Sequence, residues 1–173
     1  MKALLNLFNR LFFNAFLFLL VPVTAIAGLD ESFLQAVYEG DRKEVESLLN
    51  LRANIESRTQ KRSTALIVAS GQNDSEMVRF LLSRGSRVNS RNRCDDTALL
   101  LCSTRGNTRC VKSLIEGEVD LDTRNMHGWS PLARAARYGH LETMQLLLKH
   151  GANVNIQLND GATPLLIAIG EEH

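Results

Sequence analysis

The sequence lacks the motifs that commonly carry enzymatic chemistry. It has no phosphate-binding Gly-rich loop, no nucleophile elbow and no paired acidic motif. Its four histidines, His127, His140, His150 and His173, have a spacing that matches no metal site. We therefore predict no catalytic residue, no metal and no cofactor, and the class of enzymes is disfavoured.

The chain also lacks an overall charge of one sign and any nucleic-acid-binding motif. It has 20 basic and 19 acidic residues. The balance is uneven along the chain, because the segment from Arg79 to Lys112 has eight basic residues and only Asp95 and Asp96 as acidic ones. This segment is either a solvated Arg-rich surface or a patch that attracts an acidic partner. Without a nucleic-acid motif, we expect that partner to be a protein and not a nucleic acid.

Long apolar runs are missing everywhere except near the N-terminus, where residues 1–27 differ in character from the rest. Lys2 and Arg10 supply positive charge, Leu11 to Val23 is mostly apolar, and Ala25-Ile26-Ala27 is a small-x-small cleavage site. This order is typical of a secretory signal peptide. We expect the mature domain, residues 28–173, to be periplasmic or secreted.

The alternative for the N-terminal segment is an uncleaved membrane anchor. Leu11 to Leu29 spans 19 residues, close to the roughly 20 residues that a bilayer requires. Asn14, Pro22 and the Ala-x-Ala ending favour cleavage. No other apolar stretch is long enough to cross a membrane, so we expect no stable membrane insertion after cleavage.

The rest of the chain repeats with a period of 33 residues and needs no gaps to align. In the copy from Gly128 to Gln157, Ser130 and Pro131 are expected to begin a short helix that Gly139 ends. A second helix is expected to end at Gly151. Neither helix can bury its apolar face alone, so the copies must stack. The matching columns are Ser130 with Thr64, Thr97 and Thr163; Leu132 with Phe33, Leu66, Leu99 and Leu165; Ala135 with Ala36, Ala69, Cys102 and Ala168; and Leu147–Leu148 with Leu48–Leu49, Leu81–Leu82 and Leu114–Ile115.

This pattern resembles the ankyrin-repeat family, whose repeat also has 33 residues and a Thr-Pro-Leu-His core. The resemblance extends from about Asp30 to the C-terminus and implies an all-α ankyrin-repeat solenoid of stacked helix pairs with connecting hairpin loops. The half-repeat at the end can be a cap or the edge of a longer protein, and we expect Leu165, Ile167 and Ile169 to cover repeat 4. We expect a monomer with repeats at about 30–57, 63–90, 96–124 and 128–157 and a half-repeat at 161–173.

The sequence departs from the family pattern at two kinds of position. The glycine that closes the second helix is Arg52 in repeat 1 and Glu118 in repeat 3. A non-Gly residue in the left-handed conformation costs about 1–2 kcal/mol. We therefore expect the backbone at these two corners to be less favourable, and the repeats less ideal there, than where glycine is present. The histidine of the family core is absent, whereas His140 stands where the family commonly has His and is expected to be structural. The residues in place of the core histidine are Ile67, Leu100, Ala133 and Leu166.

Cysteines are few, and all three lie in or beside repeat 3. Cys102 belongs to a buried column, and Cys110 faces inward at the start of the second helix. In an exported chain the two can form a disulfide if their geometry permits. The interpretation that the sequence favours is two small buried thiols. Because the number is odd, at least one thiol stays free or pairs between chains, and Cys94 lies on a hairpin.

The resemblance implies that a partner binds the concave surface formed by the hairpin tips and the first helices. Trp129 is the only tryptophan and is expected on a hairpin, not in the core. Trp, Tyr and Arg contribute most of the binding energy at interfaces. The predicted partner-binding residues are Trp129, Tyr138, Arg137, Met126 and His127 of repeat 4 and Arg105 and Arg93 of repeat 3. Repeats 1 and 2 add Tyr38, Glu39, Gln60, Lys61, Ser63 and Gln72 to the variable positions.

Two residues of repeat 4 leave alternatives open. Trp129 can instead fold onto its neighbouring hairpin and support it. Arg134 stands in a column that otherwise holds Val68, Leu101 and Ile167. Its side chain either extends to the concave face or makes a polar contact there.

The sequence thus favours an exported, bacterial-type ankyrin-repeat protein that binds another protein in the periplasm and has no catalytic activity. From what resembling proteins do, it would support or protect an exported enzyme, or neutralise a toxin as an immunity protein. The alternative is a secreted effector that binds host proteins.

We predict that the exported protein begins at Gly28, because the Ala-x-Ala ending places the cleavage after Ala27. Intact-mass measurement of the exported protein tests this. A chain that still begins at Met1 and stays with the membrane would show that the segment is an anchor.

Overall fold

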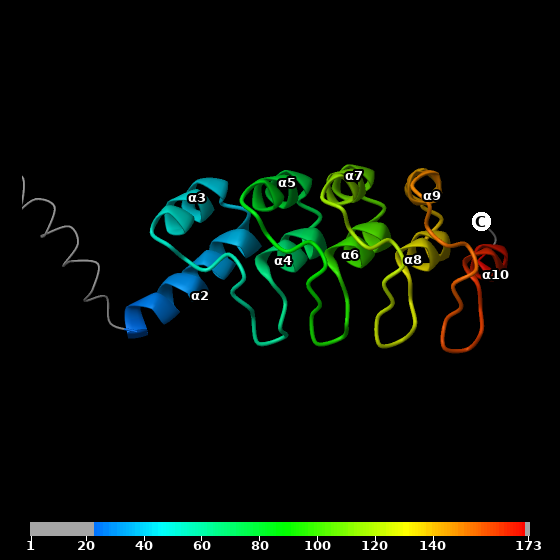
Figure 1. Ribbon diagram of the computed structural model, residues 1–173, viewed down its shortest axis with the longest axis horizontal. Helices are drawn as coiled ribbons and strands as arrows, with labels where there is room; N and C mark the ends of the chain where they lie inside the picture. The colour runs from blue at the N-terminus through cyan, green and yellow to red at the C-terminus, as the bar shows by residue number, and fades with distance from the viewer. Residues whose placement is uncertain (1–22, 172–173) are drawn as a thin grey trace, which may run out of the picture.

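The structure is a row of stacked helix pairs. The computed structural model describes residues 23–171, and Figure 1 shows two layers of helices with hairpin loops projecting to one side. The all-α solenoid that the resemblance implies is confirmed. The first-helix layer is α2 (Val23–Glu39), α4 (Ala65–Gly71), α6 (Ala98–Arg105), α8 (Pro131–Arg137) and α10 (Pro164–Gly170). The second-helix layer is α3 (Arg42–Asn50), α5 (Ser75–Ser83), α7 (Thr108–Glu116) and α9 (Leu141–Lys149).

Side-chain caps determine where the helices begin. A hydroxyl oxygen at the N-cap of each helix from α4 to α10 in the first layer accepts a hydrogen bond from the backbone N–H three residues further on, at 3.2–3.5 Å. Such caps satisfy N–H groups that the helix leaves unpaired. The predicted cap at Ser130 is confirmed, and Pro131 follows it at the first helical position. The other hydroxyl caps are Thr64, Thr97 and Thr163.

Residues with positive φ, in the left-handed backbone conformation, form the corners that follow the helices. Gly139 and Gly151 have φ of 64° and 93°, as expected for residues that end a helix. Arg52 and Glu118 have φ of 72° and 59°, although they have side chains. The prediction that repeats 1 and 3 are less ideal at this corner is therefore confirmed.

The core consists of the repeated apolar columns. Leu66, Leu99 and Leu132 are buried in the first-helix layer, and Leu81 and Leu114 are buried in the second. Within the repeats each helix of the first layer from α2 to α8 packs on the second helix that follows it, and along the stack the contacts run from α2 to α10 in the first layer and from α5 to α9 in the second. Burying one such side chain stabilises the fold by about 1.5–3 kcal/mol. The stack is therefore held together by contacts between neighbours.

Three arginines at the 33-residue period connect successive hairpins. Arg58 donates from Nη1 to the backbone oxygen of Arg91 at 2.9 Å, and Arg91 donates from Nη1 to that of Arg124 at 2.8 Å. Arg124 continues the row by donating from Nη2 to Oδ1 of Asn159 at 2.9 Å. These bonds fix each hairpin relative to the next one.

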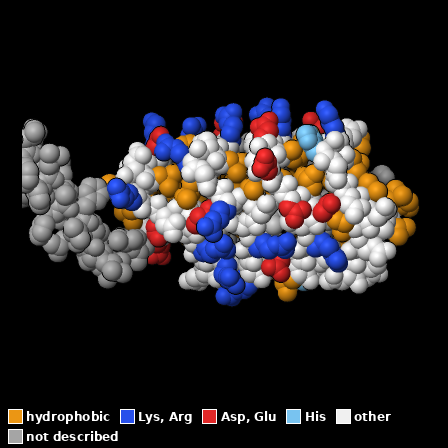
Figure 2. All heavy atoms as spheres, viewed as in Figure 1, with side chains coloured by type: hydrophobic (Ala, Val, Ile, Leu, Met, Phe, Trp, Pro, Cys, Tyr) orange, Lys and Arg blue, Asp and Glu red, His pale blue; other side chains and the backbone are white. Residues whose placement is uncertain are grey.

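The last described helix exposes three of its four large apolar side chains. Leu165 is 69% exposed and Ile169 is 64% exposed, and Figure 2 shows hydrophobic side chains at the end of the stack that carries α10. The expectation that both cover repeat 4 is wrong, whereas Ile167 is half-buried. Leu165 belongs to the column of Leu132, and that column is buried only where another repeat follows.

Cys102 and Cys110 form a disulfide, with their Cα atoms 5.9 Å apart. The favoured interpretation of two buried thiols is therefore wrong. Sequence alone could not decide this, because the bond depends on how α6 and α7 pack. Cys94 is exposed and free.

The predicted signal segment lies largely outside the described residues, since the description begins at Val23. Residues 23–27 continue the first helix of repeat 1. Cleavage after Ala27 stays a prediction. None of the helices described is both long enough and apolar enough to pass through a bilayer.

We predict that Leu147→Ala lowers the free energy of unfolding by about 2–5 kcal/mol, through lost burial and a cavity. Leu147 has an exposed fraction of 0%, whereas the adjacent Leu148 is 41% exposed. Leu148→Ala is thus a matched control and should cost less than about 1 kcal/mol. Urea unfolding followed by circular dichroism measures both. Equal losses for the two variants would contradict the packing described for repeat 4.

We predict that reduction of the disulfide lowers the stability by about 2–3 kcal/mol, as expected for a short closed loop. The two cysteines are 8 residues apart in sequence. Urea unfolding with and without reductant measures the effect, in the Cys94→Ser protein to prevent bonds between chains. Identical midpoints, with both remaining thiols alkylated in the unreduced protein, would show that the bond does not form.

Candidate binding groove

The candidate site is the groove between the first-helix layer and the hairpins. Two columns of helix residues, spaced by 33, form what we call the groove floor. Hairpin residues such as Thr59, Gln60 and Lys61 form the opposite wall. The groove floor consists of Gln35, Val68, Leu101 and Arg134 from one column and Tyr38, Gly71, Thr104 and Arg137 from the other.

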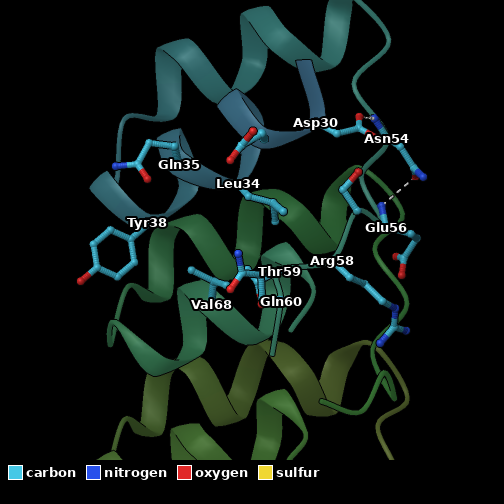
Figure 3. A pocket seen from close by; sticks show the side chains of 12 residues that line it. Asp30, Leu34, Gln35, Tyr38, Asn54, Glu56, Arg58, Thr59, Gln60 and Val68 are labelled. Atoms are coloured by element: carbon cyan, nitrogen blue, oxygen red, sulfur yellow. Dashed lines mark hydrogen bonds between the residues drawn. The ribbon is translucent and has the colours of Figure 1, made fainter. Parts of the chain in front are cut away.

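The groove contains two hollows at repeats 1 to 3. One hollow of about 710 Å³ lies between α2 and the first hairpin, and an adjoining hollow of about 540 Å³ reaches from Tyr38 to Leu101. Figure 3 shows Leu34 and Val68 beside the hairpin residue Gln60, with Tyr38 at one edge. Tyr38 is 58% exposed. The floor here is largely apolar and open to solvent, which is typical of a binding surface.

The acidic residues at the repeat 1 edge have structural partners. Asp30 accepts a hydrogen bond at Oδ1 from the backbone N–H of Asn54 at 2.7 Å. Glu56 accepts one at Oε1 from the backbone N–H of Arg87 at 2.8 Å. Asp30 thus joins α2 to the loop after α3, and Glu56 joins this loop to that of repeat 2. Because both carboxylates already accept hydrogen bonds, they are less available to a ligand.

At repeat 4 the floor becomes basic and aromatic. Arg134 and Arg137 lie over the ring of Trp129, with Cζ 4.6 Å and 5.3 Å from the ring centroid. Such contacts contribute about 0.5–1 kcal/mol each at exposed sites. Arg137 also approaches Glu171, with Nη2 and Oε1 3.7 Å apart, which makes a weak surface ion pair. Trp129 is half-buried and rests on the arginines of its own repeat.

The structure shows where Trp129 lies, and its role in binding stays a prediction. It lies outside the core, as expected, but it stacks on side chains of α8 rather than supporting a neighbouring hairpin. Arg134 does extend toward the concave side, where it meets this ring. Its buried Nε has no hydrogen-bond acceptor among the residues that the structure describes.

Tyr138 and His140 form a second pair beside this cluster. Their rings stack with centroids 6.1 Å apart, and Nε2 of His140 lies 3.1 Å from the backbone oxygen of Thr104. A Cβ at Gly106 would lie only 2.5 Å from Nδ1 of His140, so glycine is required there. His140 thus connects repeats 3 and 4, in agreement with the structural role expected for it.

The other predicted site residues lie on the hairpins and at the end of α6, and Met126 and His127 share the hairpin of Trp129. Arg93 and Met126 are exposed on successive hairpins, and their backbone N–H groups bond the preceding hairpin at 2.9 Å and 3.1 Å. His127 is exposed beside Met126, and Arg105 is exposed at the end of α6. The structure therefore brings together Trp129 and Arg137, and distributes the rest along the groove and its hairpin edge.

The basic segment of the sequence does not form a single patch. Arg79, Arg109 and Lys112 line a hollow on the second-helix layer together with Glu76 and Glu116. Arg91, Arg93 and Arg105 of the same segment lie on the hairpins and on α6. Figure 2 shows Lys and Arg side chains both along the second-helix layer and across the hairpins. Neighbours in sequence are separated here because each repeat passes through both layers.

The sequence-based prediction placed the binding residues at repeats 3 and 4 and identified the hollow at repeats 1 to 3 only in part. Its variable positions Tyr38, Gln60, Lys61, Ser63 and Gln72 line this hollow, but Val68, Gly71 and Leu101 were not among them. The sequence did contain a signal for this hollow, because Gly71 is a helical glycine. The equivalent positions of the other repeats hold the larger Tyr38, Thr104 and Arg137. Across the described part of the chain, no group of three His, Cys, Asp or Glu side chains is arranged to hold a metal ion.

Comparison with known families agrees with the repeat geometry. A family model described as ankyrin repeats (3 copies) matches residues 33–125 and again residues 99–173. The chain belongs to the ankyrin-repeat family. Members of this family act in general as non-catalytic modules for protein–protein interaction.

Curated relatives share short stretches of this ankyrin-repeat domain. The chain is 50% identical over 46 residues to Rabankyrin-5 of Homo sapiens, covering 27% of this chain and 4% of that protein. It is 53% identical over 38 residues to the Inhibitor of Bruton tyrosine kinase of Xenopus laevis, covering 22% and 3%. It is 45% identical over 47 residues to the Fibronectin type 3 and ankyrin repeat domains 1 protein of Mus musculus, covering 27% and 14%. The chain therefore spans only a small part of these relatives.

Proposed function

We propose that this ankyrin-repeat domain is exported and holds a protein partner in its concave groove. The observation that carries the proposal is the open, largely apolar floor at Val68 and Leu101, which continues into the Trp129 cluster. Residues that serve only the fold are buried between repeats, whereas these side chains face a hollow. Partner binding explains why apolar and aromatic groups stay partly exposed there.

Two features support export. The N-terminal segment has the order of a signal peptide, and the disulfide between Cys102 and Cys110 is a bond that persists in oxidising compartments such as the periplasm. In that compartment the module supports, protects or inhibits its partner, for example an exported enzyme or a toxin.

The groove is suited to binding because the hairpins are connected in a row. The hydrogen bonds from Arg58 to Arg91 and from Arg91 to Arg124 hold the hairpin wall in place before a partner arrives. A preorganised surface loses less conformational entropy on binding. The partner can therefore be recognised without a large rearrangement.

Site-specific photo-crosslinking in cells that export the protein identifies the partner. The crosslinking residue is placed at Met126 or Arg105 in the groove, and at Arg79 or Lys112 on the second-helix layer as controls. Crosslinks from the groove positions alone support the proposal. Crosslinks from the second-helix layer alone would place the binding site on the convex side.

With the partner in hand, we predict that Trp129→Ala weakens binding by about 2 kcal/mol or more, chiefly through faster dissociation. Leu141→Ala is a matched control, since Leu141 is an exposed apolar residue on α9. The double variant Arg93→Glu and Arg105→Glu should instead slow association if the partner is acidic, and added salt should reduce the effect. Surface plasmon resonance measures both. Unchanged kinetics in these variants, with the fold intact by circular dichroism, would exclude the part of the groove at repeats 3 and 4.

A further inference from the structure

Gly71 is a glycine that neither the backbone nor the packing requires. It is the last residue of α4 and is not among the residues with positive φ. A Cβ at this position would meet only Leu101 Cδ1, at 3.6 Å, which is ordinary van der Waals contact. Glycine in a helix costs roughly 0.5–1 kcal/mol relative to alanine. What the missing side chain provides is space.

That space lies in the apolar part of the groove floor. The hollow beside Gly71 is lined by Tyr38, Ile67, Val68 and Leu101, with Lys61 among the polar residues at its hairpin wall. In the adjacent repeats the same column holds the larger Tyr38 and Thr104. The groove floor is therefore indented at repeat 2, at a place whose lining suits an apolar side chain.

The charge of the groove changes along the solenoid. Glu31 lines the hollow at repeat 1, and Lys61 lines the hollow beside Gly71. Arg105 is exposed at repeat 3, and Arg134 and Arg137 lie at repeat 4. The two arginines of repeat 4 contact Trp129, and the 3.7 Å approach of Arg137 to Glu171 leaves most of its donors available. Acidic groups on a partner are thus attracted toward repeats 3 and 4 and repelled from repeat 1.

We infer that the groove selects a partner segment that inserts one apolar side chain beside Gly71 and places carboxylates on one side of it, against Arg105 and Arg137. This inference rests on the proposed function and adds the chemistry of the bound segment. Packed helices lie roughly 8–10 Å apart, and an extended chain rises about 3.3 Å per residue. The acidic residues therefore lie about three and about six positions from the apolar one.

A phage-displayed library of random peptides of about 12 residues, long enough in extended form to span these repeats, tests the inference on the exported protein. The expected clones share an apolar residue with acidic residues about three or six positions away on one side. Clones without this pattern, or the absence of any enriched clone, would overturn the inference.

Variants of Gly71 test the hollow with a synthetic copy of an enriched peptide in fluorescence anisotropy. Gly71→Leu fills the hollow and should weaken binding at least about tenfold, as for the loss of an interface anchor. Gly71→Ala is the matched control, because its Cβ makes only ordinary contact, and it should bind within about twofold of the unmodified protein. Equal affinities for the two variants would contradict the inference.

Charge reversal at repeats 3 and 4 tests the inference independently of Gly71. It remains usable if the Gly71→Leu protein does not fold. Arg105→Glu with Arg137→Glu should weaken the acidic peptide at least about tenfold. The same double variant should regain affinity for a peptide in which lysine replaces the acidic residues. Loss without this rescue would show that the arginines act through the fold and not through the peptide.

The photo-crosslinked partner distinguishes this inference from the proposed function. If Trp129→Ala weakens the partner but Gly71→Leu and the charge reversal do not, the inference fails and groove binding stands. If none of these changes affects the partner, the proposed function fails as well. If all of them weaken it, both are supported.

Discussion

The burial of leucine columns between adjacent repeats is the interaction on which the whole structure depends. The described helices other than α2 have seven to nine residues, too few to be stable alone. Each becomes stable when residues such as Leu99 and Leu114 enter the space between two helix pairs. Stability is therefore shared between neighbours and is not the property of any one repeat.

This dependence on neighbours also explains what happens at the end of the stack and on its concave side. Leu165 is exposed because no described repeat follows to bury it, although the equivalent Leu132 is buried. The floor positions, in contrast, lie at the edge of this core, where Val68 packs against it and stays only partly buried. They can hold Val68, Leu101 or Arg134 without disturbing the stack. The charge and polarity of the groove can therefore vary while the architecture stays the same.

Rigidity of the groove comes from polar contacts that follow the same period as the core. Arg58, Arg91 and Arg124 join hairpin to hairpin, and Nε2 of His140 lies within hydrogen-bonding distance of the backbone oxygen of Thr104 on α6. The disulfide of repeat 3 adds a covalent constraint between α6 and α7. The apolar floor and the Trp129 cluster are therefore held at fixed positions along the groove.

The sequence by itself determined the repeat, the helix ends and the buried columns, because these follow from local capping and from a strict 33-residue period. It also identified Trp129 and Arg134 as unusual, and it named Arg137 and Tyr138 as binding residues, which stays a prediction. Only the tertiary structure decided the disulfide, the exposure of Leu165, the dispersal of the basic segment and the hollow beside Gly71. These depend on which side chains of different repeats come within contact distance, and a period in sequence states which positions correspond but not what their side chains touch.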